Sequence, residues 1–551
     1  MKNIYKLILV GMAGVLLGLP SCSNEIDPND LMLHPINTAV IVGLGNTQRY
    51  NAVVGEILTI DPIVVFLEVP NGPAPDFSFA WYMGGEVISE EEILRVRVEG
   101  ELARVLGNRD NIMAFRVTDN NTGIVVTRTV YLNVTSRLTR GWLALTERDN
   151  SYDIDFLVNF NDTVTLHTGI LDMFESTVPR LGETPKAFHA FQNNRPLRMG
   201  PINLTGYTIW VQTDKAIYNL NAADNYSLFS SDLLPFAVPG TPAFSAGFIP
   251  GRITTFSHSA VRLYMKYDGN MYSATSQNGL FPFEFPINRV SGENNDALFN
   301  VSPYVFGTVV GASLLFDEDN KRFLRHNHPP AGATSPSRGI TFLHPLFDTA
   351  EDVALFSWTD NIERLVYMSN YNTNAGFAII KDKVLGYRYL EFATSTSVLA
   401  NNVMNKSFGR TFNDNAFIES AKFFAKHPSQ PYFYMASEDK VYRMMVSTNE
   451  LINMWEDVTD EVLKQGYRIS VFQFTANNGS TGSPQGYITV GSYNPNGKVG
   501  ENGRIEFFNV DGATGNFTPR ETVSGVAGGE FEEGMSFTGI GKPIGISYKN
   551  Q

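Results

Sequence analysis

Side chains that could do chemistry are few along this chain of 551 residues. His326 and His328 are two apart, so on a strand they would share a face and could hold a metal through their imidazole nitrogens. Pro329 and Pro330 follow at once, and we favour an exposed loop that leaves a strand. The segment Asp317-Glu318-Asp319-Asn320 offers oxygen ligands but lacks the spacing and downstream glutamate of a calcium loop. We favour a solvated hairpin tip there.

Motifs of the well-known enzyme classes are missing from the sequence. It has no Gly-x-Ser-x-Gly elbow, no phosphate-binding Walker loop, no His-Glu-x-x-His and no Cys/His zinc pattern. Aspartates and glutamates are abundant, so a pair of acids for glycoside hydrolysis is compatible with the composition, but no pair stands out. We predict no catalytic residue, no metal site and no cofactor.

Cys22 is the only cysteine, and it follows a segment typical of secretion signals. Lys2 and Lys6 precede the apolar run 7–19, which is too short to span a bilayer comfortably. The run ends in Leu19-Pro20-Ser21-Cys22, a sequence that resembles the lipobox, in which cleavage exposes a cysteine that is then acylated. We predict a signal peptide at 1–21 and a lipid on Cys22. The alternative is an ordinary signal peptide with a chance cysteine at its end.

The next residues, 22–34, read as a polar, proline-containing tether. Its acidic residues Glu25, Asp27 and Asp30 suit either a surface-export signal or a simply solvated linker. The whole chain carries a formal charge of −14, and loss of Lys2 and Lys6 with the signal leaves −16. Such a surface repels phosphate backbones, so we expect no nucleic acid partner. A second long apolar run is absent from the sequence, so we expect the lipid to be the only membrane attachment.

The region 35–137 alternates apolar and polar residues as strands do. A run of about seven short strands in about 100 residues, separated by turn signals, is typical of an immunoglobulin-type β-sandwich. Trp81 lies in mid-region, and we expect it in the core. The turn 120–123 joins the last two strands as a hairpin. The apolar segments are 39–42, 57–60, 63–69, 77–82, 113–119 and 124–134.

The region 138–551 repeats one unit: an aromatic-rich strand, a tight polar turn and a second strand. Repeats of about 40–50 residues that each form a small sheet are typical of β-propellers. We therefore predict an all-β chain, a sandwich followed by a propeller of seven blades. The alternative is a set of unrelated hairpins from a sandwich or jelly roll. The copies lie at 142–156, 207–220, 261–273, 312–324, 376–390, 432–444 and 487–508.

Aromatic residues fall into two groups by position. Those in the repeated strands should pack between blades: Trp210, Tyr264 and Tyr434. Those expected in loops could stack on sugars or anchor a partner, although packing is the simpler role: Tyr304, Trp358 and Trp455. One short helix is expected at 459–466, between blades.

These motifs, taken in order, resemble the PKD-like family of Bacteroidota surface lipoproteins. The motifs are the lipobox at Cys22, the segments 79–85 and 115–123, and the Gly141-Trp142-Leu143-Ala144-Leu145 start of the C-terminal region. Cys22 is the one functional residue that the resemblance assigns in this sequence. The resemblance implies an immunoglobulin/PKD-like sandwich and an outer-membrane, lipid-anchored protein that faces the cell exterior.

The same resemblance implies a non-enzymatic accessory subunit of a Sus-like nutrient uptake system. Its partners would be a TonB-dependent transporter, the transporter's lipoprotein lid, and an oligosaccharide or peptide substrate. The alternative is a surface glycoside hydrolase or peptidase built on a propeller, because propellers also carry such enzymes.

Overall fold

The computed structural model describes most of the chain between Thr38 and Lys549. With 58% strand and 4% helix, the structure confirms the predicted all-β class. Cys22 and the tether lie outside the described residues. Within the described part, no helix is long and apolar enough to cross a membrane. The described ranges are 38–45, 48–67, 74–104, 111–135, 138, 141–160, 163–199, 202–221, 226–230, 252–256, 262–267, 270–275, 286–293, 297–307, 312–327, 342–372, 374–394, 403–412, 416–446, 451–476, 484–520 and 535–549.

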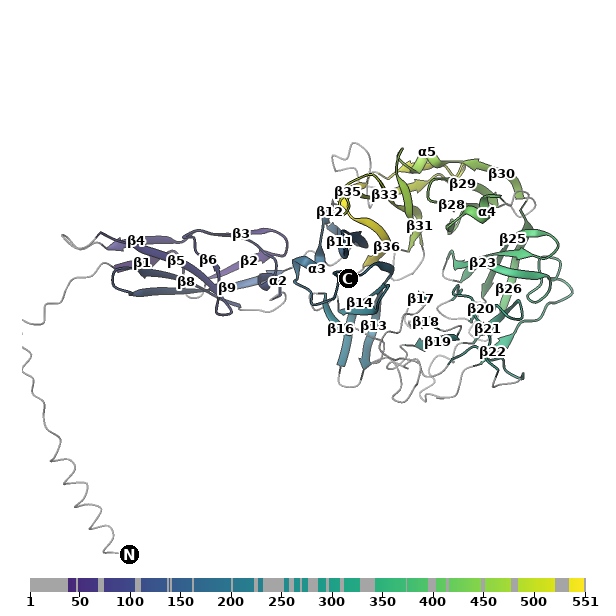
Figure 1. The fold of residues 1–551 in the computed structure, drawn as a ribbon, viewed down its shortest axis with the longest axis horizontal. Helices are drawn as coiled ribbons and strands as arrows, with labels where there is room; N and C mark the ends of the chain where they lie inside the picture. The colour runs from purple at the N-terminus through teal and green to yellow at the C-terminus, as the bar shows by residue number, and fades with distance from the viewer. Residues whose placement is uncertain are drawn as a thin grey trace, which may run out of the picture. The chain divides into compact units, whose positions relative to one another are not determined.

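The chain divides into two compact units, one drawn from residues 1–50, 59–96 and 110–132 and the other from 51–58, 97–109 and 133–551. The N-terminal strands form a five-stranded sheet in the order β2-β9-β8-β5-β6 and two pairs, β1-β4 and β3-β7 (Figure 1). The strands are β1 (Thr38–Val42), β2 (Arg49–Val53), β3 (Ile57–Ile60), β4 (Ile63–Leu67), β5 (Phe77–Met83), β6 (Glu86–Ser89), β7 (Leu94–Arg97), β8 (Asn111–Asp119) and β9 (Val125–Thr135), with a short helix α2 (Glu101–Arg104).

The core of these N-terminal strands is built around Trp81, as predicted. Trp81 is fully buried, its ring centroid lies 4.7 Å from that of Phe115, and its indole N–H donates to the Glu92 carbonyl at 3.1 Å. Phe66 of β4 stacks on Phe77 of β5 with ring centroids 4.6 Å apart. This contact joins the β1-β4 pair to the five-stranded sheet, as in a two-layer sandwich.

One face of the β1-β4 pair is apolar and exposed. In the antiparallel register Val40 lies opposite Val65 and Val42 opposite Ile63, while Leu67 lies two residues beyond Val65 on the same face. The exposed fractions of these five residues are 39% for Val40, 46% for Val42, 60% for Ile63, 43% for Val65 and 52% for Leu67. We call them the β1-β4 face. A contiguous aliphatic face of this kind is a candidate contact surface for a partner.

The second unit contains seven sheets among the described residues, which Figure 1 shows arranged around a centre. This is the predicted propeller. The sheets run β36-β10-β11-β12, β13 to β16, β17 to β19, β20 to β22, β23 to β26, β27 to β30, and β31 to β34 with β35 paired to β33. The first sheet therefore joins the C-terminal strand β36 to three strands from the start of the unit.

The strands of the first four sheets are β10 (Gly141–Arg148), β11 (Ser151–Phe160), β12 (Thr163–His167), β36 (Lys542–Lys549), β13 (Pro185–Met199), β14 (Ile202–Thr213), β15 (Ile217–Asn221), β16 (Ser227–Ser230), β17 (Arg252–Phe256), β18 (Arg262–Tyr267), β19 (Asn270–Thr275), β20 (Ser313–Asp317), β21 (Arg322–His326) and β22 (Leu343–Pro345). Helix α3 (Ile170–Met173) follows β12.

The strands of the last three sheets are β23 (Ile362–Asn370), β24 (Ala375–Asp382), β25 (Gly386–Thr394), β26 (Met404–Thr411), β27 (Phe423–Lys426), β28 (Tyr432–Ala436), β29 (Val441–Val446), β30 (Leu451–Asp457), β31 (Arg468–Ala476), β32 (Pro484–Tyr493), β33 (Gly503–Val510), β34 (Phe517–Pro519) and β35 (Ser536–Ile540). Helices α4 (Ala416–Ser420) and α5 (Thr459–Val462) lie between sheets. The expected helix at 459–466 is thus present but shorter.

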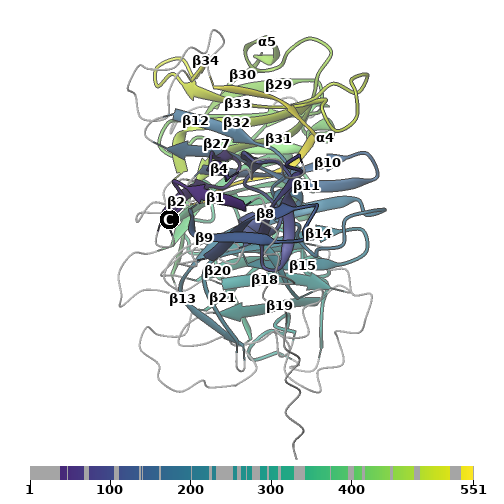
Figure 2. The ribbon, with the colours of Figure 1, turned by 90° about the vertical axis from the view of Figure 1, so that its left-hand side faces the viewer.

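Each predicted hairpin forms two adjacent strands of one sheet, for example β28 with β29 and β18 with β19. In the four-stranded sheets these are the middle two strands. Neighbouring sheets share apolar cores. The third and fourth sheets lie side by side in Figure 1 and Figure 2, and Tyr264 of β18 shares one core with Leu315 of β20. Trp142 of β10 likewise shares a core with Phe507 of β33, which links the first sheet to the seventh. A blade cannot bury its own faces, so this packing holds the ring together.

Ring closure depends on β36, which pairs with β10 from Gly141↔Lys549 to Glu147↔Lys542. We expect truncation after Gly541 to abolish cooperative thermal unfolding, because it removes the inner strand of the first sheet and exposes β10. Differential scanning calorimetry checks this, with truncation after Lys549 as the control. An unchanged transition in the shorter chain would contradict the role of β36.

Lys549 makes this closing strand sensitive to pH. Its ammonium donates to the Leu138 carbonyl at 3.0 Å and lies 5.3 Å from the Tyr226 ring centroid, and burial lowers its pKa from 10.5 to about 8. Because the folded pKa is the lower one, the folded state binds this proton less tightly, and stability should rise as pH increases through the interval from about 8 to 10.5.

We expect the unfolding free energy to rise by about 2 kcal/mol from about pH 7 to about pH 9.5 through this group. Lys549→Met should lack that rise, and comparing the two proteins cancels the titration of other groups. Urea unfolding at both pH values measures it. Parallel pH profiles for the two proteins would contradict the assignment.

Candidate functional site

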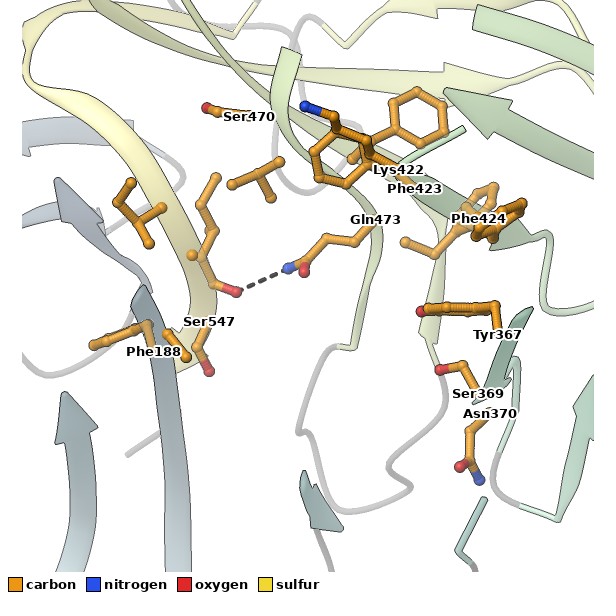
Figure 3. Close-up of a pocket in the computed structure, with 18 of the residues that line it drawn as sticks. Phe188, Tyr367, Ser369, Asn370, Lys422, Phe423, Phe424, Ser470, Gln473 and Ser547 are labelled. Atoms are coloured by element: carbon orange, nitrogen blue, oxygen red, sulfur yellow. Dashed lines mark hydrogen bonds between the residues drawn. The ribbon is translucent and has the colours of Figure 1, made fainter. Parts of the chain in front are cut away.

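The inner edges of the propeller sheets enclose a central channel with a cavity volume of about 650 Å³ (Figure 3). Its wall comes mainly from the edge strands β13, β23, β27, β31 and β36, and Tyr304 adds a side chain from the segment before β20. This volume falls within the range typical of small-ligand sites, about 300–1,000 Å³. The channel is therefore the candidate functional site.

The described residues of the wall are aromatic, neutral polar, cationic and aliphatic, and no aspartate or glutamate is among them. The aromatic residues are Phe188, Tyr304, Tyr367, Tyr371, Phe377, Phe423, Phe424, Phe472 and Phe474. The polar and cationic residues are Gln212, Ser369, Asn370, Ser470, Gln473, Ser547, Lys186, Lys422 and Lys426.

Three aromatic rings form a ladder along one side of the channel. Tyr304 lies 5.0 Å from Tyr367, and Tyr367 lies 5.1 Å from Phe424, measured between ring centroids. Tyr304 lies in the segment before the fourth sheet, Tyr367 in the fifth sheet and Phe424 in the sixth. Figure 3 shows Tyr367 and Phe424 on the same side of the cavity. Phe424 is buried in a core, whereas Tyr304 and Tyr367 are half-buried, so these two rings are the ones on which a sugar or another ring can stack.

Polar side chains of the wall also join neighbouring sheets to one another. The Gln473 amide donates to the Ile546 carbonyl at 2.8 Å, the dashed line in Figure 3, and the Ser547 hydroxyl donates to the Ala190 carbonyl at 3.1 Å. The Asn370 amide donates to the Gly307 carbonyl at 2.6 Å and accepts from the Gly307 N–H at 3.1 Å. These bonds fix the orientation of the polar groups that face the channel.

Lys426 is a buried cation in the wall. Its ammonium donates to the Gln430 carbonyl at 2.7 Å and the His427 carbonyl at 3.2 Å, and it lies 5.1 Å from the Tyr371 ring centroid. Burial lowers the pKa of Lys426, and the charge of Glu391 partly offsets this shift. Lys422, by contrast, is exposed and pairs with Glu438 at 2.5 Å.

The two motifs singled out for metal binding have structural roles. His326 was expected in an exposed loop, but it is buried at the end of β21, and its Nδ1 lies 2.8 Å from the Tyr264 hydroxyl. His328 lies outside the described residues. Asp317 is also buried; its carboxylate accepts from the Asp319 and Asn320 backbone N–H groups at 3.0 and 2.9 Å.

Asp319 and Asn320 are exposed at the β20–β21 turn, as a hairpin tip requires. Within the described ranges, no group of three or more His, Cys, Asp or Glu side chains could hold a metal ion.

Of the three aromatic residues expected in loops, only Tyr304 lies in the channel wall. Trp358 is buried in a core shared by the fourth and fifth sheets. Trp455 lies in β30, not in a loop, and its ring stacks on Phe412 with centroids 5.5 Å apart. The strand aromatic residues are buried as predicted: Trp210, Tyr264 and Tyr434.

The remaining channel residues were missed by sequence reasoning, although a signal was present. In the second, third, fifth, sixth and seventh sheets, the strand before the recognised hairpin is the first strand of the same sheet. β27 precedes the hairpin at 432–444, and β23 precedes the hairpin at 376–390. For the fifth and sixth sheets, the strand that precedes the repeat contains most of the segment 367–371 or 422–426, respectively, and most residues of these segments line the channel.

Comparison with solved structures finds similar folds at low sequence identity. A quinonprotein alcohol dehydrogenase-like protein from Bacteroides thetaiotaomicron shares 11% identity, over 93% of this chain and 99% of that chain, with a TM-score of 0.44. AofleA from Arthrobotrys oligospora shares 15% identity over 65% and 89% of the two chains, with a TM-score of 0.29. The Cps50 (Swd1) β-propeller domain of Myceliophteria thermophila shares 9% identity over 63% and 90%, with a TM-score of 0.29.

A search of curated proteins finds no match to this sequence. Residues 30–177 match the model of the PKD-like family. The sequence had predicted this family from the segments 79–85 and 115–123, which both lie inside the matched range. The chain therefore carries a PKD-like family domain at residues 30–177 together with a β-propeller.

Proposed function

We propose that the protein is a non-enzymatic accessory subunit of a Sus-like nutrient uptake system, anchored by a lipid on Cys22 to the outer surface of the outer membrane. It docks beside a TonB-dependent transporter and its lipoprotein lid, and it captures an oligosaccharide or peptide before import. The proposal joins the lipobox sequence, the PKD-like domain and two surfaces of the folded chain.

The observation that carries the proposal is the chemistry of the channel wall. Stacking surfaces such as the half-buried rings of Tyr304 and Tyr367 stand beside amide and hydroxyl groups that hydrogen bonds hold in place. Sites that bind polar organic ligands combine apolar surface with a few oriented polar groups. These features support capture of a substrate.

The β1-β4 face supports the docking role. Thr38, where β1 begins, is 16 residues after Cys22, so a lipid on Cys22 would keep this face within about 55 Å of the membrane. A membrane transporter is the partner that such a short tether keeps at high effective concentration. We therefore propose that the β1-β4 face packs against an apolar surface patch of the transporter complex.

The double variant Ile63→Lys, Val65→Lys tests the docking surface. It places two charges on the face, which should cost the interface several kcal/mol and abolish co-purification of the transporter in mild detergent. The variant Val384→Lys is the control, because Val384 is exposed at a turn of the fifth sheet. Circular dichroism should show both variants folded. Undiminished recovery of the transporter with the double variant would rule out this face.

The anchor is tested by Cys22→Ala, which should release the protein into soluble fractions because the acyl chains supply the membrane affinity. Intact-mass analysis of the wild-type protein should show a chain that begins at an acylated Cys22. A mature chain with another start, or without acyl mass, would contradict the anchor.

The same wild-type preparation, incubated with glycan and peptide pools, distinguishes capture from hydrolysis. We expect bound ligand and no product. Product formation that one Asp or Glu substitution abolishes, with no transporter retained, would establish a hydrolase instead.

A further inference from the structure

The described part of the channel wall carries charge of the opposite sign to that of the chain. The sequence holds 56 acidic and 42 basic residues, yet the described residues that line the channel include three lysines and no carboxylate. In a cavity with low-dielectric walls, a few fixed charges of one sign attract ligands of the opposite sign. The wall is therefore biased towards anions.

Lys426 is placed to contact such an anion. An ammonium has three N–H donors, and two of those on Lys426 bond to the Gln430 and His427 carbonyls. The neighbouring carboxylate, Glu391, accepts from the Tyr389 hydroxyl at 2.6 Å and is not among the residues that line the channel. Two of its three donors thus bond to backbone carbonyls, and Lys426 is itself among the residues that line the cavity.

Lys186 and Lys422 contribute unequally. Lys186, at the start of β13, is exposed and has no ion-pair partner within the described residues. Lys422 is paired with Glu438, which lies outside the channel lining, so much of its charge is already balanced. Lys186 and Lys426 are thus the two cations that a bound anion would meet.

We propose that the channel binds acidic oligosaccharides, which carry carboxylate or sulfate groups on their sugar rings. Anionic groups along the oligosaccharide pair with Lys426 and Lys186, and sugar faces stack on the half-buried rings of Tyr304 and Tyr367. The flat rings favour a sugar over an acidic peptide, because extended peptides present few flat faces for stacking. This inference rests on the proposed capture function and names the class of ligand.

The test is isothermal titration calorimetry on the mature full-length protein with three probes: oligogalacturonate for carboxylate, a carrageenan oligosaccharide for sulfate, and a cello-oligosaccharide as the neutral probe. We expect at least one acidic probe to bind, the neutral probe to bind at least about tenfold more weakly, and the acidic affinity to fall with salt. Comparison of the affinities for oligogalacturonate and the carrageenan oligosaccharide shows whether the channel prefers carboxylate or sulfate.

Lys186→Glu should weaken acidic binding by at least about tenfold. It is chosen because Lys186 is exposed and its replacement should not disturb folding. Lys383→Glu, which makes the same charge change at an exposed turn of the fifth sheet, should leave binding unchanged. Tyr367→Ala should weaken binding of oligosaccharides but not of a poly-glutamate peptide.

Four results would overturn the inference: no binding of either acidic probe, equal binding of the neutral probe, an unchanged affinity in Lys186→Glu, or tighter binding of poly-glutamate than of both acidic sugars. Because transporter co-purification is measured separately, its persistence in any of these cases would leave the docking proposal standing. Loss of transporter co-purification while acidic oligosaccharides still bind would contradict the docking proposal and leave the inference on ligand class standing.

Discussion

The pairing of β36 with β10 is the interaction on which the rest of the propeller depends. It links two segments about 400 residues apart in the chain and supplies the first sheet with its inner strand. An open ring would leave β10 as an unpaired edge and would expose the core that Trp142 shares with Phe507. Closure brings the inner strands together around one cavity, so the channel is a consequence of the same pairing.

The polar groups at the inner edges serve both structure and recognition. Gln473 bonds to Ile546 and Ser547 bonds to Ala190, so the seventh, first and second sheets are linked at the channel wall. Side chains fixed in this way lose little conformational entropy when a ligand binds. The same argument applies to Lys426, whose two carbonyl partners hold its ammonium in the wall.

The hairpins were predictable because the middle strands of a blade are buried on both faces. Tyr434 and Tyr264 lie in such strands, and their aromatic, continuous apolar pattern marks them in the sequence. The inner strands carry no comparable pattern. The segment Lys422 to Lys426 mixes exposed, half-buried and buried positions because one side faces the channel and the other faces a core. Local spacing could not identify it.

Long-range contacts account for the other differences between the sequence predictions and the structure. The pair Pro329-Pro330 indicated a loop near His326, but the Tyr264 hydroxyl, 62 residues earlier in the chain, lies within hydrogen-bond distance of that imidazole. Trp358 lies in a loop between β22 and β23, as expected, but its side chain is buried in a core with Phe323 and Phe392 from two different sheets. No short window of sequence contains such information, because the partners meet only in the folded ring.

Hydrogen–deuterium exchange of the intact mature protein, with and without a mixture of neutral and acidic oligosaccharides, tests the central claim most directly. If the channel captures the ligand, protection should increase together in peptides covering 186–190, 367–371, 422–426 and 544–547, which are distant in sequence but line one cavity. Protection confined to other peptides, or no change under conditions where calorimetry detects binding, would place the binding site elsewhere.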